Sequence, residues 1–122
     1  MKASRLIAFA IVLIFASLSA QAQSNPPDDF LVPENPAWRR VLGNPIEANF
    51  YKADIQTVAK VLSDQGLCSV VVEVSPQRNI PLVTRKLHRV SLRTAIYLVC
   101  QDTGLNAGWI YAGRIPQVIR LY

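Results

Sequence analysis

Cysteine and histidine carry the most reactive side chains in this chain, and only three are present: Cys68, Cys100 and His88. In an oxidising compartment the two cysteines are candidates for a disulfide, which would close a loop of about 33 residues and contribute roughly 3 to 4 kcal/mol. Alternatively, both are small buried apolar residues, and the sequence leaves the two interpretations open. A catalytic redox pair is not expected, because the cysteines lack Cys-x-x-Cys spacing.

His88 stands among the cationic residues Arg85, Lys86 and Arg89, which disfavour a metal ion, and no second His or Cys lies at ligand spacing. The chain has no glycine-rich phosphate loop, no Gly-x-Ser-x-Gly elbow and no His-Glu-x-x-His helix. We therefore expect a protein that is not an enzyme, with no catalytic residues, no metal and no cofactor. His88 is expected on the surface of a strand.

The first 22 residues have the features of a secretory signal peptide. Lys2 and Arg5 precede an apolar run from Leu6 to Leu18, and Ala20-Gln21-Ala22 forms a small-x-small cleavage site. The apolar run is shorter than the roughly 20 residues that a membrane-spanning helix needs. We expect cleavage near Ala22, a periplasmic location and no transmembrane span in the mature chain.

Cleavage would leave about 100 residues, enough for one compact domain and too few for two. Loss of Lys2 and Arg5 lowers the net charge from +5 to about +3. This charge is mild, and a periplasmic protein meets little nucleic acid, so nucleic-acid binding is not expected.

Residues 23–44 are rich in proline, which fixes φ and removes a backbone donor. This composition predicts an extended tail without a helix. Four apolar residues in it are costly to leave in water: Phe30, Leu31, Val32 and Trp38. They either fold back onto the domain or act as anchors for a partner.

From Pro45 onward the periodicity predicts a strand over Ile46–Tyr51, followed by a helix that Asp54 caps. Gly66 is placed to end this helix in a left-handed conformation. The β-branched run Cys68–Val74 predicts a second strand.

The second half repeats this plan, with a strand over Ile80–His88 and a helix from its Ser91 cap to Gly104. Residues 106–113 and 115–122 predict two strands joined by a tight turn near Gly113 and Arg114. The motif Asp-x-Gly-Leu occurs at Asp64–Leu67 and again at Asp102–Leu105. It predicts two equivalent helix ends, in each of which the leucine packs onto the last turn. The expected fold is a small α+β domain, βαββαββ, with two helices packed on short sheets.

This pattern resembles the short domain found at the N-termini of secretins and TonB-dependent transducers (the STN domain). The similarity covers residues 45–122 and includes Val90-Ser91-Leu92 before the second helix and Thr103-Gly104-Leu105 after it. The family usually has an apolar residue where this chain has Arg85. The resemblance implies a freestanding copy of the domain that docks, without catalysis, onto a protein of the cell envelope. That partner would belong to an outer-membrane secretion, pilus or TonB-dependent assembly.

Two docking surfaces are expected: the tail, and an exposed edge of the terminal strand Ile115–Tyr122, which carries Val118 and Arg120. A rival hypothesis is a freestanding binder of a small envelope ligand such as peptidoglycan. It would use Trp109, Tyr111 and Tyr122 as a stacking surface.

Overall fold

The computed structural model describes residues 25–33, 35–113 and 115–122, so the predicted signal peptide lies outside the described residues. Its elements follow the order βαββαββ after one short helix, which confirms the α+β prediction. In chain order they are α2 (Pro36–Leu42), β1 (Pro45–Ala53), α3 (Ile55–Gly66), β2 (Val70–Val72), β3 (Val83–Ser91), α4 (Leu92–Thr103), β4 (Ala107–Ala112) and β5 (Ile115–Leu121).

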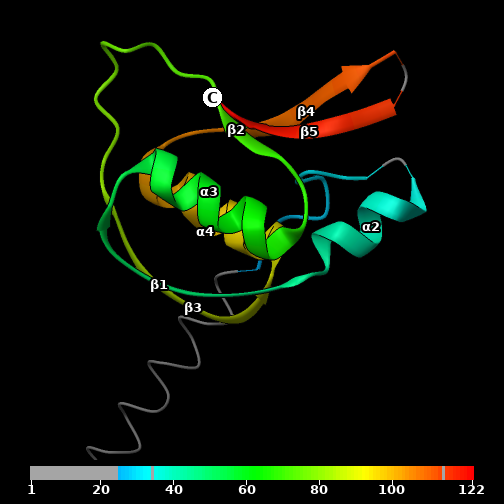
Figure 1. Ribbon diagram of the computed structural model, residues 1–122, viewed down its shortest axis with the longest axis horizontal. Helices are drawn as coiled ribbons and strands as arrows, with labels where there is room; N and C mark the ends of the chain where they lie inside the picture. The colour runs from blue at the N-terminus through cyan, green and yellow to red at the C-terminus, as the bar shows by residue number, and fades with distance from the viewer. Residues whose placement is uncertain (1–24, 34, 114) are drawn as a thin grey trace, which may run out of the picture.

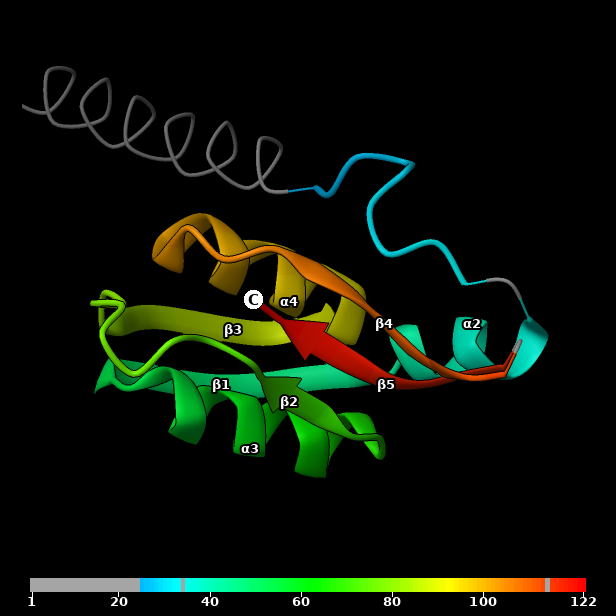
Figure 2. The same ribbon diagram turned by 90° about the horizontal axis from the view of Figure 1, so that it is seen from above.

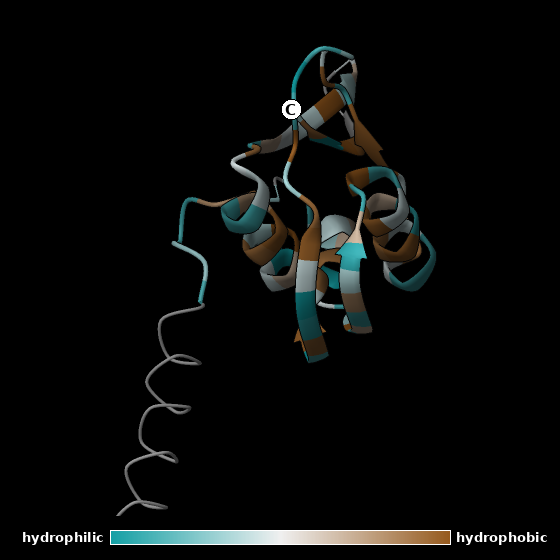
Figure 3. Cartoon of the chain, turned by 90° about the vertical axis from the view of Figure 1, so that its left-hand side faces the viewer, coloured by the Kyte–Doolittle hydropathy of each residue, from teal (hydrophilic) through white to brown (hydrophobic). Residues whose placement is uncertain are grey.

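Helices α3 and α4 lie side by side in one layer between two small sheets (Figure 1; the side view of Figure 3 shows the same layers). One sheet consists of β1 and β3, which pair antiparallel. The other has the order β2-β5-β4, with β5 parallel to β2 and antiparallel to β4. Seen from above in Figure 2, α3 and α4 lie on opposite sides of the view, and the strands of the two sheets overlap in projection between them.

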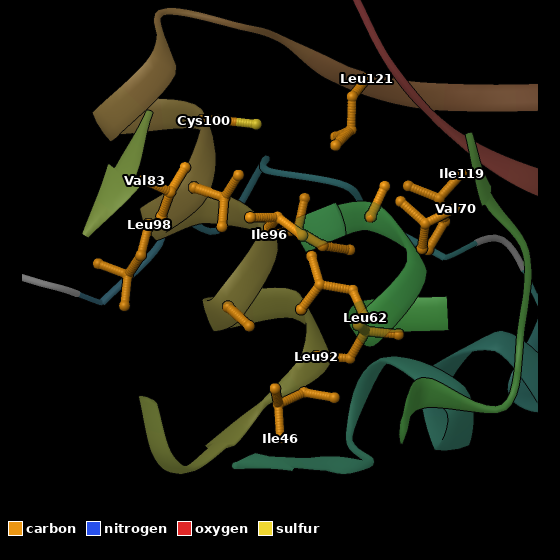
Figure 4. Close-up of a cluster of buried hydrophobic side chains, with 14 of the residues drawn as sticks. Ile46, Leu62, Val70, Val83, Leu92, Ile96, Leu98, Cys100, Ile119 and Leu121 are labelled. Carbon is orange, nitrogen blue, oxygen red and sulfur yellow. The ribbon is translucent and has the colours of Figure 1, made fainter. Parts of the chain in front are cut away.

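The two helices begin where the sequence predicts. The Asp54 carboxylate accepts a hydrogen bond from the Thr57 amide at 2.8 Å, and Ser91 Oγ accepts one from the Thr94 amide at 3.1 Å. The apolar faces of both helices then meet the inner faces of both sheets (Figure 4). The residues with the least exposed side chains come from every layer and include Ile46, Leu62, Leu87, Leu92, Ile96, Ile119 and Leu121.

The two Asp-x-Gly-Leu copies are not equivalent. In the second copy, Gly104 has the predicted left-handed φ of 74° and Leu105 is buried. In the first copy, Gly66 is the last helical residue and Leu67 takes the left-handed φ of 56° with 80% of its surface exposed, so the prediction for this copy is wrong. Close packing accounts for the glycine at this position, because a Cβ on Gly66 would lie 2.7 Å from Leu92 Cδ2.

The prediction of a helix-free tail is also wrong, since residues 36–42 form α2. Asn35 Oδ1 accepts a hydrogen bond from the Trp38 amide at 2.9 Å, which caps the first turn. Pro36 occupies the first helical position, where its fixed φ and missing N–H are favourable. Leu31 and Leu42 are buried in the main hydrophobic core. The core of the domain therefore begins before Pro45.

Arg85 joins β3 to α4. Its Nε and Nη2 donate to the two carboxylate oxygens of Asp102 at 2.6 and 2.7 Å. This bidentate hydrogen bonding raises the pKa of Arg85 above its usual value. A charge-assisted pair thus connects β3 to the last turn of α4.

Candidate functional site

An open groove of about 500 Å³ runs along the outer edge of β1, beside α3. Strand β1 has β3 as its neighbour in a two-stranded sheet, so within the described residues its other edge carries no strand. One wall of the groove comes from the strand and the other from residues spaced four apart on α3. The lining consists of Glu47, Ala48, Asn49, Phe50, Tyr51, Ala53, Thr57, Val61 and Gln65. We call this site the β1–α3 groove.

The side chain of Gln65 shows which main-chain groups face this groove. Its Oε1 accepts a hydrogen bond from the Glu47 amide at 2.7 Å, and its Nε2 donates to the Glu47 carbonyl at 2.7 Å. One carboxamide therefore makes both hydrogen bonds that a residue of a neighbouring antiparallel strand would make. Because edges alternate along a strand, the N–H and C=O groups of Asn49 and Tyr51 point the same way as those of Glu47.

The groove combines an apolar floor with a polar rim. Phe50 is buried, and Ala53 and Val61 are half-buried against the core. Tyr51 stands at one end of the groove with 74% of its surface exposed. On the outer face of β1, Glu47 Oε1 lies 2.7 Å from Nδ1 of His88, which is the surface strand residue that the sequence predicts. The site is thus suited to an extended chain rather than to a reacting small molecule.

The predicted tail anchors mostly fold back onto the domain. Leu31 is buried, the ring of Phe30 meets Tyr97 edge-on at 5.2 Å, and that of Trp38 meets Trp109 at 4.7 Å. Val32 is exposed. Arg93 of α4 donates hydrogen bonds to the carbonyls of Phe30 and Pro27 and so holds this segment against the domain. The tail residues therefore belong to the domain, and one of the four predicted anchors faces solvent.

The predicted free edge of the terminal strand is wrong for residues 119–121, because β5 lies between β2 and β4 in its sheet. Its residues 119–121 pair with β2 on one side, while β4 pairs along the other side. Val118 and Arg120 are half-buried, and Arg120 Nε lies 2.7 Å from Glu73 Oε2. The guanidinium of Arg120 also lies 4.4 Å from the centre of the Tyr122 ring. The sequence missed this because a parallel partner 49 residues earlier leaves no local signal.

The three aromatic residues suggested for ligand stacking do not gather on one face. Trp109 packs inward against Trp38 and the core. Tyr122 lies against Gly108, whose side of β4 is opposite to that of Trp109. Tyr111 is 45% exposed and follows a register irregularity in β4. The structure therefore provides no common stacking surface for them.

Cys68 and Cys100 are both free thiols, so the candidate disulfide is not formed. The end of α3 packs against the first residue of α4, as the contact between Gly66 and Leu92 shows. Cys100 lies eight residues further along α4, about 12 Å along the helix axis. Figure 4 shows Cys100 and Leu92 well separated on α4. The two thiols are therefore on different parts of the helix layer, and the alternative of buried small residues applies to Cys100.

We expect both thiols to react slowly and to remain unpaired in the folded protein. Burial raises the pKa of Cys68 and of Cys100 to about 11, so roughly one thiol in a thousand is ionised at pH 8. Intact-mass measurement after blocking with iodoacetamide in urea should show two added groups without prior reduction. A mass with no added group, and a melting temperature that falls on reduction, would contradict this expectation.

Among the described residues, no three His, Cys, Asp or Glu side chains lie together in a way that could hold a metal ion. In the same part of the chain, no helix has the length and apolar character needed to cross a bilayer.

Sequence reasoning missed the β1–α3 groove and the role of Gln65. The alternation of Ile46, Ala48 and Phe50 predicted the strand, but strand order decides which edge stays open. The only available signal was the spacing of Thr57, Val61 and Gln65 on one helix face outside the buried stripe. Comparison of the chain with family models, curated proteins and solved structures finds no match.

Proposed function

We propose that the protein is a non-catalytic periplasmic interaction module, serving as a component or accessory of an outer-membrane secretion, pilus or TonB-dependent receptor assembly. The observation that carries this proposal is the open edge of β1 beside an apolar groove. Exposed strand edges bind extended partners through main-chain hydrogen bonds. The order of elements in residues 45–122, with two helices between two sheets, supports the resemblance to the short secretin and TonB domain.

The periplasmic location rests on the signal-like sequence of residues 1–22, where two basic residues precede an apolar run and a small-x-small site. The mild net charge of the protein favours a partner recognised by shape and main-chain pairing over one recognised by a strong electrostatic field. A protein partner fits these properties, whereas a polyanion does not.

The proposal is tested by capturing partners from envelope extract of the source organism on immobilised mature chain, residues 23–122, with quantitative mass spectrometry. We expect an outer-membrane or secretion component to be enriched over an unrelated exported domain of similar charge, and to capture this chain when it is itself immobilised. The proposed function is wrong if neither direction of capture enriches an envelope assembly protein.

A further inference from the structure

We propose that the β1–α3 groove binds one extended peptide segment of a partner protein, which adds as a third strand to the β1–β3 sheet and displaces the Gln65 carboxamide. This inference rests on the proposed function and identifies the kind of partner segment and the surface that receives it. It depends on the described residues of β1 and α3 alone.

The first argument comes from the two hydrogen bonds between Gln65 and Glu47, both 2.7 Å. A carboxamide has the same donor and acceptor as a peptide group. Its position therefore marks the place where the backbone of an added strand would lie. Asn49 and Tyr51, which follow Glu47 on the same edge, extend the row of main-chain groups over about 13 Å, the length of a five-residue strand segment.

The second argument comes from α3, whose residues Thr57, Val61 and Gln65 line the groove beyond the edge of β1. The helix therefore lies beneath the position of the added strand and gives it a surface to pack on. A symmetric second copy of this domain would bring its own α3 into the same space. The occupant is consequently a segment without a helix packed beneath it, such as a linker or terminus of a partner protein.

The chemistry of the groove predicts the pattern of the segment. Side chains opposite Ala48 and Phe50 would point inward, toward Val61, and should be apolar. Side chains between them would face solvent beside Asn49 and Tyr51 and are free to be polar. The expected partner sequence alternates apolar and polar residues over about five positions.

Gln65 acts in this arrangement as an internal competitor. In the free protein it covers one pair of edge groups, which protects the edge from unselective pairing. A bound strand takes over both hydrogen bonds and releases the carboxamide to solvent. Removing the carboxamide should therefore strengthen binding rather than weaken it.

The test uses a displayed library of random 12-residue peptides, selected on the mature chain, with affinities then measured by fluorescence polarisation. Asn49→Pro removes an edge N–H, whereas the matched control Asn49→Ala keeps it. We expect at least about tenfold weaker binding for Asn49→Pro and a change within about threefold for Asn49→Ala. Gln65→Ala should bind about fivefold more tightly. The enriched peptides should show the alternating pattern.

A second pair of variants covers the case in which Asn49→Pro does not fold. Thr57→Arg fills the groove from an exposed position of α3, and Gln56→Arg places the same charge on a neighbouring exposed residue outside it. Thr57→Arg should weaken binding at least about tenfold, and Gln56→Arg should not. The inference is overturned if no peptide is enriched, if folded groove variants bind as well as the wild type, or if sedimentation shows a wild-type dimer that Thr57→Arg dissociates.

Repeating the envelope capture with Thr57→Arg separates this inference from the proposed function. A partner captured by the wild type and lost by the variant supports both. A partner captured equally by both proteins keeps the proposed function but overturns the groove as its docking site. If the wild type captures no partner, the proposed function fails, and the peptide measurements then decide the inference alone.

Discussion

Leu105→Ala is expected to lower the free energy of unfolding by about 3 kcal/mol, whereas Leu67→Ala should lower it by less than about 0.5 kcal/mol. The two leucines occupy the same position in the repeated Asp-x-Gly-Leu motif. Leu105 is 4% exposed, so truncation removes buried methyl groups and leaves a cavity, while Leu67 is 80% exposed and loses little. Urea denaturation of both variants, followed by circular dichroism, measures the difference.

Leu67→Ala is the matched control, because it is the same substitution after the same glycine. The left-handed conformation of Leu67 is kept, with φ near 56°, since alanine meets the same backbone penalty there as leucine does. Equal losses for the two variants would mean that the two helix ends pack alike and that Leu67 is buried in solution.

The comparison also shows how far sequence reasoning reaches in this chain. Helix starts were predictable because Asp54 and Ser91 act through bonds to residues three positions away. The end of α3 was not predictable from the sequence. The requirement for glycine at position 66 comes from Leu92, which is 26 residues distant in the sequence and contacts Gly66 only after folding. A local motif can therefore predict a turn without predicting which residue of it is buried.

The candidate site shows the same limit. The alternation in β1 was visible, yet its open edge depends on a strand order in which β5 is central to the other sheet. The prolines of the tail suggested an extended segment, but Asn35 and Pro36 instead start a helix that carries Leu42 into the core. The first error arises because strand order is set by long-range packing, and the second because the local helix-start signal of Asn35 and Pro36 was not recognised in a proline-rich segment.

A chain that starts at Asn44 is expected to be less stable than the chain that starts at Gln23 by about 5 kcal/mol or more. The deletion removes two buried leucines, Leu31 and Leu42, each worth roughly 2 to 5 kcal/mol. It also removes the carbonyl of Phe30, to which Arg93 Nε donates at 2.8 Å. Since the total free energy of unfolding of a small domain is about 5 to 15 kcal/mol, the shorter chain should be partly or wholly unfolded at 25 °C.

Urea denaturation followed by circular dichroism, which does not depend on Trp38, measures this loss. Within the longer chain, Leu42→Ala should cost about 3 kcal/mol, and Val32→Ala should cost less than about 0.5 kcal/mol because Val32 is exposed. A shorter chain as stable as the longer one would show that the tail is a separable segment, free to serve as an anchor. If the shorter chain loses the expected stability, its failure to capture a partner would report unfolding and not the loss of a docking surface. Point variants in the β1–α3 groove are therefore the better way to locate the docking surface.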